Sequence, residues 1–443
     1  MPILESQFNT SFCRRVVSAW EQWRTSDPRP LYQLRIPLSE MPSFQTRLGG
    51  SDPYQVYWQN RSGDVEAIGL GTAEMLWAEQ QAEIPDVFDR MEKRLESCDD
   101  DIRFYGGMVF DRDRPLTSLW SQLGLCRFWI PLIEWRRYQQ DAQLIITTTS
   151  LEERVLETVL KAVTSSQQTE HPHVDTRVRR ETCCPTRDQW QQRVTALIEE
   201  LKSISGKAVL SFQEIIEFTH TVDPVWLWDR LCAKVEGAYL FSVTVSDHVF
   251  LGASPECLYG RHGHEIESEA LAGTGPSVRP GVLLSSDKDN QEHNYVIRDM
   301  IEALGSICTE VRRSEQKESL IWQDLAHLRT RLSGQLKPSI RDRDILAALH
   351  PSAAVLGYPR DRARQWLQTY EDPERGWYAG PIGWIGRDRS EFAVAIRSAL
   401  ICGNRLAMSA GAGIIRESDP KAEWQEVQSK MSLFRDIMEL DGV

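Results

Sequence analysis

Residues 239–253 read Tyr-Leu-Phe-Ser-Val-Thr-Val-Ser-Asp-His-Val-Phe-Leu-Gly-Ala, a pattern typical of two β-strands joined by a tight turn. Residues 54–71 repeat this pattern, with Arg61-Ser62-Gly63-Asp64 as the turn between two strand-like runs. Strands joined by such short turns pair in antiparallel fashion. The two hairpins therefore suggest a duplicated antiparallel layer.

The neighbouring segments add strands and helices to this layer. Strand patterns cover residues 104–110, 127–133 and 143–148, and helical patterns cover residues 73–98 and 151–163. Residues 165–187 are polar and lack an apolar period, so we expect a linker there. Thr186 and Gln189 then resemble a capping box that opens a helix through Leu201. Strands in runs with helices outside them, rather than strict βαβ alternation, favour an α+β fold: layered antiparallel β-sheets forming a sandwich, with helices packed outside.

The composition of the 443-residue chain excludes several classes of protein. Its net charge of −13 disfavours nucleic acid or an anionic membrane surface as a partner. Nine cysteines without a Cys-x-x-Cys pair argue against a zinc site and for a reducing compartment. No signal-peptide-like or membrane-spanning apolar run occurs. We therefore expect a cytoplasmic protein that binds neither nucleic acid nor a membrane.

Two segments carry carboxylates at helical spacing. Asp289 and Glu292 follow Ser286 near the start of one expected helix, and Glu423, Glu426 and Lys430 share a face of another, expected from Pro420 to Leu440. Carboxylates from two helices that face one cleft suit a hard cation such as Mg²⁺. The same spacings also occur on solvated helix faces and in acidic first turns that the helix dipole favours.

One lysine and one glutamate stand out because of their neighbours. Lys207 is the charged member of an apolar strand pattern over residues 206–212, where a lysine is ordinarily at an edge or extends its amine to solvent. In a closed site, desolvation would lower the pKa of this amine and make it a usable base. Glu256 follows Pro255 after a strand pattern; such a residue is ordinarily on the surface, but in a pocket it can hold a proton and act as an acid.

Several further positions are candidates for ligand contacts. Residues 271–275, with Gly273 and Thr274, form a small-residue turn whose N–H groups can bind a carboxylate, and residues 410–415, with Gly413, form a glycine-rich strand that permits close approach. The remaining candidates are Arg397, whose guanidinium can bind a carboxylate, Tyr378, whose hydroxyl can donate a hydrogen bond, and His350, which we expect at a helix end or in a loop.

In this order, the segments resemble the chorismate-utilising enzymes. This family contains isochorismate synthases, salicylate synthases, and the chorismate-binding subunits of anthranilate and aminodeoxychorismate synthases. The resemblance is strong over residues 185–440, the catalytic region, and only general over residues 1–180, the variable N-terminal part. It implies the family's sandwich fold, with both parts in one integrated unit.

The resemblance also implies a role for each candidate. Glu292 and Glu426 match the family's Mg²⁺-binding glutamates, and Asp289 and Glu423 are neighbours that can bind through water. Gly273 and Thr274 match the turn that contacts chorismate. His350 matches a histidine at the edge of the site, and four further positions match groups that hold the substrate's carboxylates: Tyr378, Arg397, Gly413 and Lys430.

Two positions separate the branches of the family. Ala272 stands where the aminodeoxychorismate branch often has a nucleophilic lysine, and Lys207 stands where the amine-adding branches have glutamine. Lys207 therefore resembles the branches that add water, in which no glutaminase partner is expected and general-base help is needed. Residues 350–380 are most similar to the isochorismate synthases of menaquinone biosynthesis. The resemblance thus implies Mg²⁺-dependent conversion of chorismate to isochorismate, with Lys207 as base and Glu256 as acid; a salicylate synthase, which also eliminates pyruvate, and a catalytically silent chorismate-binding protein remain alternatives.

Overall fold

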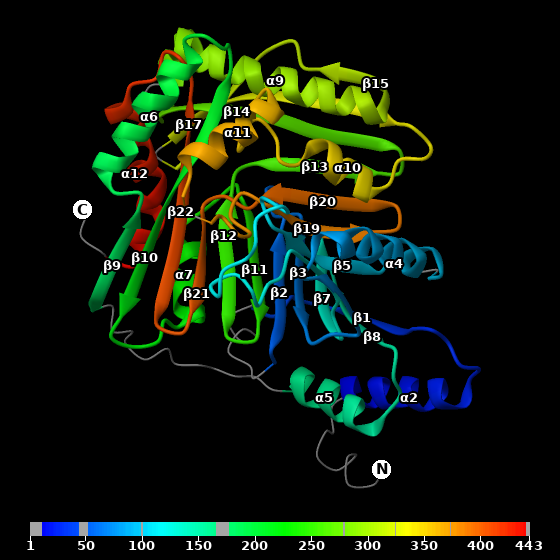
Figure 1. Cartoon of the computed structure of the whole chain (residues 1–443). Helices are drawn as coiled ribbons and strands as arrows, with labels where there is room; N and C mark the ends of the chain where they lie inside the picture. Colours follow the sequence, from blue (N-terminus) through cyan, green and yellow to red (C-terminus); the bar gives the residue numbers. More distant parts are fainter. Residues whose placement is uncertain are drawn as a thin grey trace.

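Two large antiparallel β-sheets form the centre of the fold in a computed structural model (Figure 1). The structure describes residues 11–43, 52–98, 101–164, 177–277, 280–323, 325–372 and 374–439. Helices surround the two sheets, as an α+β sandwich requires. The predicted fold class is therefore confirmed.

The first sheet has 12 strands and contains both hairpins that the sequence predicts. In sheet order its strands are β1 (Tyr32–Leu38), β8 (Asp141–Thr148), β7 (Ile133–Tyr138), β3 (Val65–Leu70), β2 (Tyr54–Gln59), β11 (Tyr239–Val245), β12 (His248–Ser254), β21 (Ser398–Cys402), β22 (Arg405–Ile414), β10 (Lys207–Phe218) and β18 (Gly357–Tyr358), and β9 (Val178–Cys184) also pairs with β10. The hairpins lie side by side because β2 pairs with β11, with Val56 opposite Val243.

The second sheet has 10 strands and also combines early and late parts of the chain. Its order is β15 (Cys308–Arg313), β17 (Leu325–Leu336), β14 (Glu265–Pro276), β13 (Cys257–His262), β20 (Arg389–Val394), β19 (Pro381–Gly386), β5 (Arg103–Met108), β6 (Cys126–Ile130) and β4 (Glu74–Ala78), with β16 (Glu318–Trp322) paired to β17.

The helices lie around the sheets, and α9 and α12 are the two that reach the site described below. They are α2 (Ser11–Thr25), α4 (Ile84–Glu96), α5 (Glu153–Thr164), α6 (Arg187–Leu201), α7 (Pro224–Lys234), α8 (Pro280–Ser285), α9 (Asp287–Ile307), α10 (Asp342–Leu349), α11 (Arg360–Tyr370) and α12 (Pro420–Ile437), with a 3₁₀ turn η1 at Gln81–Glu83. Thr186 caps α6 through the predicted capping box with Gln189. Among the described residues, no helix is long and apolar enough to cross a membrane.

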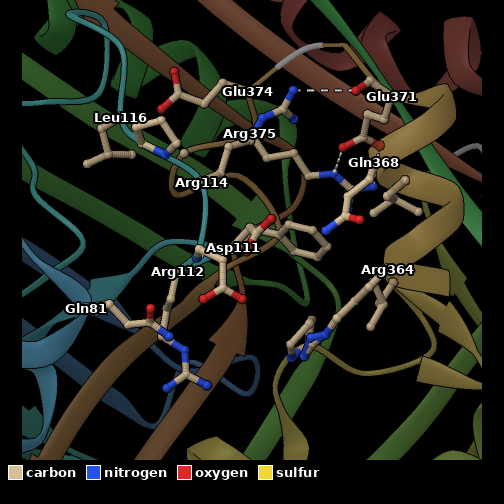
Figure 2. Close-up of a pocket in the computed structure, with 17 residues that line it drawn as sticks. Gln81, Asp111, Arg112, Arg114, Leu116, Arg364, Gln368, Glu371, Glu374 and Arg375 are labelled. Atoms are coloured by element: carbon tan, nitrogen blue, oxygen red, sulfur yellow. Dashed lines mark hydrogen bonds and ion pairs between the residues drawn. The ribbon is translucent and has the colours of Figure 1, made fainter. Parts of the chain in front are cut away.

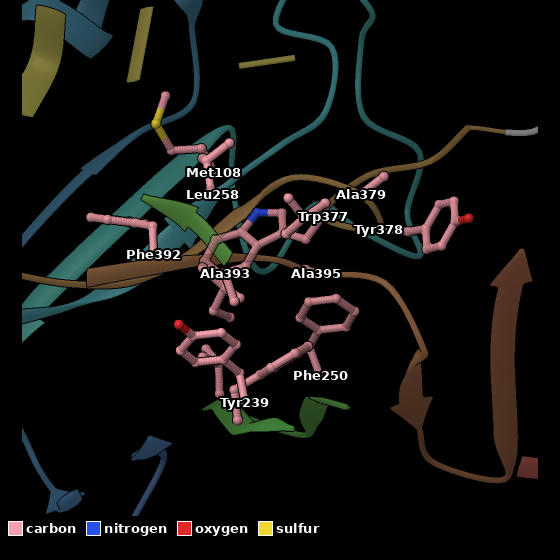
Figure 3. Packing of buried hydrophobic residues seen from close by; sticks show 14 of the residues in the cluster. Met108, Tyr239, Phe250, Leu258, Trp377, Tyr378, Ala379, Phe392, Ala393 and Ala395 are labelled. Atoms are coloured by element: carbon pink, nitrogen blue, oxygen red, sulfur yellow. The ribbon is translucent and has the colours of Figure 1, made fainter. Parts of the chain in front are cut away.

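Large side chains fill the space between the sheets. Tyr239 and Phe250 of the first sheet face Trp377 and Phe392 on the other side of the layer (Figure 3). Phe250 and Trp377 meet edge to face at 6.2 Å between ring centroids, a favourable aromatic geometry. Many of the chain's tryptophans are buried in this core.

The helix predicted over residues 73–98 is only partly correct. Its first residues form β4, in which Leu76 and Ala78 are fully buried while Trp77 between them is 49% exposed. This alternation has the period of a strand, and the helix α4 begins only at Ile84, with Pro85 in its first turn.

Two further predictions need correction. The linker predicted over residues 165–187 contains β9, an edge strand whose side chains are mostly exposed, so the strand lacks the apolar alternation that the prediction required; residues 165–176 lie outside the described residues. The turn predicted at residues 271–275 is a bulge within β14, where the pairing with β17 shifts between Ala272 and Thr274. Gly273 occupies the bulge at a φ of 76°, which glycine adopts without strain.

Candidate active site

A cavity of about 70 Å³ lies between the two sheets and the helices α9 and α12. Its walls contain most of the side chains that the sequence singles out: Lys207, Glu256, Gly273, Thr274, Glu292, Tyr378, Arg397, Gly413 and Lys430. Strands far apart in the chain bring these residues together, since β10 and β22 pair in the first sheet and β14 belongs to the second. Four candidates are not among the residues that line the cavity: Asp289, Glu423, Glu426 and His350.

Lys207 begins β10 and is buried, with only 1% of its surface exposed. Its Nζ lies 3.0 Å from Oε1 of Glu292 on α9. Gly413 on the neighbouring strand β22 makes room for this pair, because a Cβ at that position would lie 2.2 Å from Glu292 Oε1 and 2.6 Å from Lys207 Cε. The glycine-rich strand thus serves the two charged side chains directly.

Two more lysine–glutamate pairs lie beside the first. Lys288 Nζ is 2.5 Å from Glu423 Oε1, and Lys430 Nζ is 2.6 Å from Glu426 Oε1. Although burial opposes its charge, the lysines lower the pKa of Glu426 below its ordinary value. Burial, followed by the nearby charge of Glu426, raises the pKa of Glu423 to about 7. The negative charge of this region is therefore concentrated and only partly compensated.

The carboxylates on α9 and α12 offer the oxygen ligands that a hard divalent cation requires. Oε2 of Glu423 is buried and, within the part of the chain that the structure describes, has no hydrogen-bond partner, so it remains available to a cation. No three of the four carboxylates bring oxygens within 4.8 Å of one another in that part of the chain. Cation binding therefore requires these side chains to turn away from their lysines, and the donor set fits a cation chemically.

The carboxyl group of Glu256 lies in a buried turn between β12 and β13. Burial, followed by the nearby carboxylate of Glu269, raises the pKa of Glu256 to about 8. Arg61 from the first hairpin fixes this arrangement, since its Nη1 donates to the Pro255 carbonyl at 2.7 Å and to Glu269 at 2.6 Å. Glu256 is therefore protonated near neutral pH and can donate a proton.

The cavity is also lined by cationic and neutral hydrogen-bond donors. Arg397 is 7% exposed, and its Nε has no hydrogen-bond partner among the described residues. Burial lowers the pKa of Arg397 to about 10, which leaves it charged at neutral pH. Burial also raises the pKa of Tyr378 to about 12, so its hydroxyl stays protonated. Together with Lys430, these groups can hold a carboxylate in a site that excludes water.

His327 is a site residue that the sequence interpretation missed. It lies on β17, lines the cavity, and its Nδ1 is 3.2 Å from the carbonyl oxygen of Gly273. Because a carbonyl oxygen only accepts, Nδ1 carries the proton and Nε2 carries the lone pair. Burial lowers the pKa of His327 to about 3, and Nε2 has no partner within the described residues. His327 therefore offers a neutral acceptor, next to Thr274 at 3.3 Å.

His350 caps the end of α10 and lies outside the cavity. Its Nε2 donates to the carbonyl oxygens of Phe110 at 3.1 Å and Val109 at 3.3 Å. Burial lowers the pKa of His350 to about 3, so it is neutral. The resemblance implied a histidine at the edge of the site, and in the structure its side chain bonds to the segment after β5.

Arg375 and Glu371 form a buried pair that the sequence also did not mark as part of the site (Figure 2). Arg375 donates to the carbonyl oxygens of Val209 at 2.6 Å and Val355 at 2.7 Å, and Glu371 accepts from the Ser211 N–H at 2.7 Å. The pair thus ties β10, which carries Lys207, to the segment after α10. Its only signal in the sequence is the spacing of four residues between opposite charges.

Comparisons with known proteins agree with this geometry. The sequence model of a family described as "Chorismate binding enzyme" matches residues 18–439. The isochorismate synthase MenF of Escherichia coli is 30% identical over 405 residues, 87% of this chain and 88% of that protein. The chloroplastic isochorismate synthase of Catharanthus roseus is 31% identical over 77% of this chain, which spans only 63% of the length of that relative.

Solved structures give the same result for the fold. The structure of MenF, the menaquinone-specific isochorismate synthase from Escherichia coli, superimposes with a TM-score of 0.83 at 26% identity and covers 96% of this chain and 99% of that chain. Anthranilate synthase component I from Streptococcus pneumoniae superimposes with a TM-score of 0.61 at 18% identity over 93% of both chains, a likeness of fold alone.

Proposed function

The chain belongs to the chorismate-binding enzyme family, and from this membership we propose that it is an isochorismate synthase, an isomerase that converts chorismate to isochorismate. The observation that carries the proposal is the cavity wall that combines a buried lysine, Lys207, with a buried glutamic acid, Glu256, whose pKa is about 8. Such a pair suits a reaction that activates water and protonates a leaving hydroxyl.

The cationic groups of the cavity bind the substrate in this proposal. Chorismate carries two carboxylates, and the buried Arg397 guanidinium and the partly buried Lys430 amine line the site. The Tyr378 hydroxyl and the N–H groups of the Gly273–Thr274 bulge add neutral donors. The neutral His327 acceptor suits a substrate hydroxyl, which helps to orient the ring.

The chemistry follows from Lys207 and Glu256. Lys207 accepts a proton from a water molecule, and the oxygen of that water attacks C2 of the chorismate ring. Glu256 donates its proton to the C4 hydroxyl, which leaves as water while the ring double bonds shift. One water enters and one leaves, so the net reaction is an isomerisation. In its resting arrangement Lys207 is paired with Glu292, so accepting a proton requires Glu292 to engage another cationic partner.

The proposed metal is Mg²⁺, which Glu292 and Glu426 would hold, with Asp289 and Glu423 as neighbours that could contribute through water. When bound, the ion polarises the ring carboxylate of chorismate. The unpartnered Glu423 oxygen and the all-carboxylate donor set support this assignment. Lys430 lowers the pKa of Glu426 against the effect of burial, which favours the ionised carboxylate that such a ligand needs.

Lys207 and Ala272 support addition of water over addition of ammonia, and the similarity to MenF supports a role in menaquinone biosynthesis. The second candidate function is a salicylate synthase, which the same base and acid also suit. Product analysis after incubation of the protein with chorismate and Mg²⁺ separates the candidates. Isochorismate alone is expected; salicylate with pyruvate would identify a lyase, and unchanged chorismate would identify a silent binding protein.

Substitution of the two reacting residues tests their roles. Lys207→Ala should lower kcat by about 10²–10⁴-fold, the usual contribution of a general base, while chorismate still binds. Glu256→Gln should lower kcat over a similar range. Lys202→Ala is the matched control, because Lys202 is a surface residue paired with Glu199. Wild-type turnover in either site variant would rule out the corresponding role.

A further inference from the structure

A second and larger cavity, of about 450 Å³, lies beside the proposed active site (Figure 2). Its walls come from η1, from the segment after β5 and from α11 with the residues that follow it. The buried Arg375 lines both this cavity and the catalytic one, so the two cavities share a side chain. The proposed isochorismate synthase reaction makes no use of this space.

Among the described residues, two arginines of the second cavity are without a hydrogen-bond or ion-pair partner. Arg112 and Arg364 project from opposite sides (Figure 2). In the described ranges of the chain, neither side chain forms an ion pair or a hydrogen bond. Three other charged groups of the same cavity are occupied: Arg375 binds Glu371, and Glu374 accepts from the Thr117 N–H at 2.9 Å. Arg112 and Arg364 are thus the guanidinium groups left for an anion.

The rest of the lining determines what kind of anion fits. Apolar side chains supply a surface for a ring: Phe110, Leu116, Leu356 and Leu367. Asp111 and Asp113 also line the cavity, so a bare polyanion is disfavoured and a ligand with hydroxyl donors is favoured. The volume lies within the range of pockets for small molecules.

We propose that this cavity binds a small hydroxylated ring compound bearing carboxylates, through Arg112 and Arg364, and that its occupancy is coupled to the catalytic cavity through Arg375. The coupling path is short. Arg375 holds the carbonyl oxygens of Val209 and Val355, both of which line the catalytic cavity, and Val209 is two residues from Lys207 on β10. A ligand carboxylate that binds the Arg375 guanidinium would weaken its hydrogen bonds to Val209 and Val355, and so change the position of β10.

Calorimetric titration with 4-hydroxyisophthalate, a hydroxylated ring with two carboxylates, tests the binding site without relying on the reaction. The intact protein should bind this probe, and Arg112→Gln and Arg364→Gln should each weaken binding by about tenfold, since each removes one charge-assisted contact. Arg362→Gln is the matched control on the same helix, because Arg362 does not line the cavity and bonds to Gln365. Arg397→Gln, in the catalytic cavity, should leave the affinity unchanged.

Absence of binding, or affinity that falls in Arg397→Gln but not in Arg112→Gln and Arg364→Gln, would overturn the site. The coupling is read from turnover of chorismate. The probe should change kcat/KM of the wild type and of Arg362→Gln, and this change should disappear in Arg364→Gln. Binding of the probe at Arg112 and Arg364 without any change in turnover would overturn the coupling. A protein that does not turn over chorismate would still give the calorimetric result, so failure of the proposed function is distinguishable.

Discussion

The substitution Gly413→Ala tests whether the lysine–glutamate pair at the centre of the cavity is held at a fixed position. A Cβ at residue 413 would lie 2.2 Å from Glu292 Oε1 and 2.6 Å from Lys207 Cε, against about 3.4 Å for an ordinary contact. The two atoms must therefore retreat by roughly 1.2 and 0.8 Å. Displacement on the order of 1 Å in a catalytic group costs about 10²-fold in rate, and overpacking costs about 1–3 kcal/mol in stability.

The assay measures kcat and KM for chorismate together with the free energy of unfolding in urea. The expected result is a fall in kcat of about 10²-fold with a smaller change in the unfolding midpoint. Gly260→Ala is the matched control, because a Cβ there meets nothing within 4 Å and its φ is not positive. If Gly413→Ala turned over chorismate like the Gly260→Ala control, the close approach at Gly413 would have no catalytic importance and the reasoning would fail.

Three more predictions follow from buried charged groups of the protein. Activity should fall as pH rises through about 8, because Glu256 must be protonated to act as the acid and burial raises its pKa to about 8; kcat/KM measured against pH checks this. Lys288→Met should tighten Mg²⁺ binding by roughly tenfold, since it removes the ammonium that competes for Glu423; the Mg²⁺ dependence of the unfolding temperature without substrate checks this. Arg435→Met should destabilise the fold by about 3–5 kcal/mol, because it leaves the buried Glu214 without its cation; urea unfolding checks this.

Each of these predictions has a result that contradicts it. A basic limb that is unchanged in the Glu256→Gln variant would assign the pH dependence to another group. Mg²⁺ binding that is unchanged or weaker in Lys288→Met would mean that Lys288 orders the carboxylates instead of competing for them. Arg416→Met is the control for Arg435→Met, because Arg416 is exposed and its pair with Glu417 should contribute at most about 1 kcal/mol. Equal losses in the two arginine variants would mean that burial of Glu214 has no special cost.

The parts of the fold that the sequence predicts correctly are those with a local period. The two hairpins appear as strand, turn and strand because their alternation lies within about fifteen residues. The carboxylates at 289, 292, 423 and 426 share helix faces for the same reason, since the spacing i, i+3 depends only on the helix itself. The sequence does not predict that Asp289 and Glu292 lie near Glu423 and Glu426, because this depends on how α9 and α12 pack.

The parts that the sequence did not predict depend on distant neighbours. β9 is a strand because it pairs with β10, although its own side chains are exposed. His327 lies in an ordinary strand pattern, and only the bulge at Gly273 on the neighbouring strand turns it into a site residue. Arg375 carried no strong local signal either, since its partners Val209 and Val355 lie far from it in the sequence.

The three lysine–glutamate pairs explain how an acidic protein can receive a dianionic substrate. Each pair is neutral by itself: Lys207 with Glu292, Lys288 with Glu423, and Lys430 with Glu426. Under the proposed function, a divalent cation would take glutamate oxygens, and the two carboxylates of chorismate would take the cationic groups that are released. The charges of the two ligands cancel, so both can enter the buried site together without leaving an unpaired charge, whereas either one alone would break pairs without replacing them. Metal and substrate are therefore expected to favour each other's binding, and the reciprocity of coupled equilibria requires the two effects to be equal.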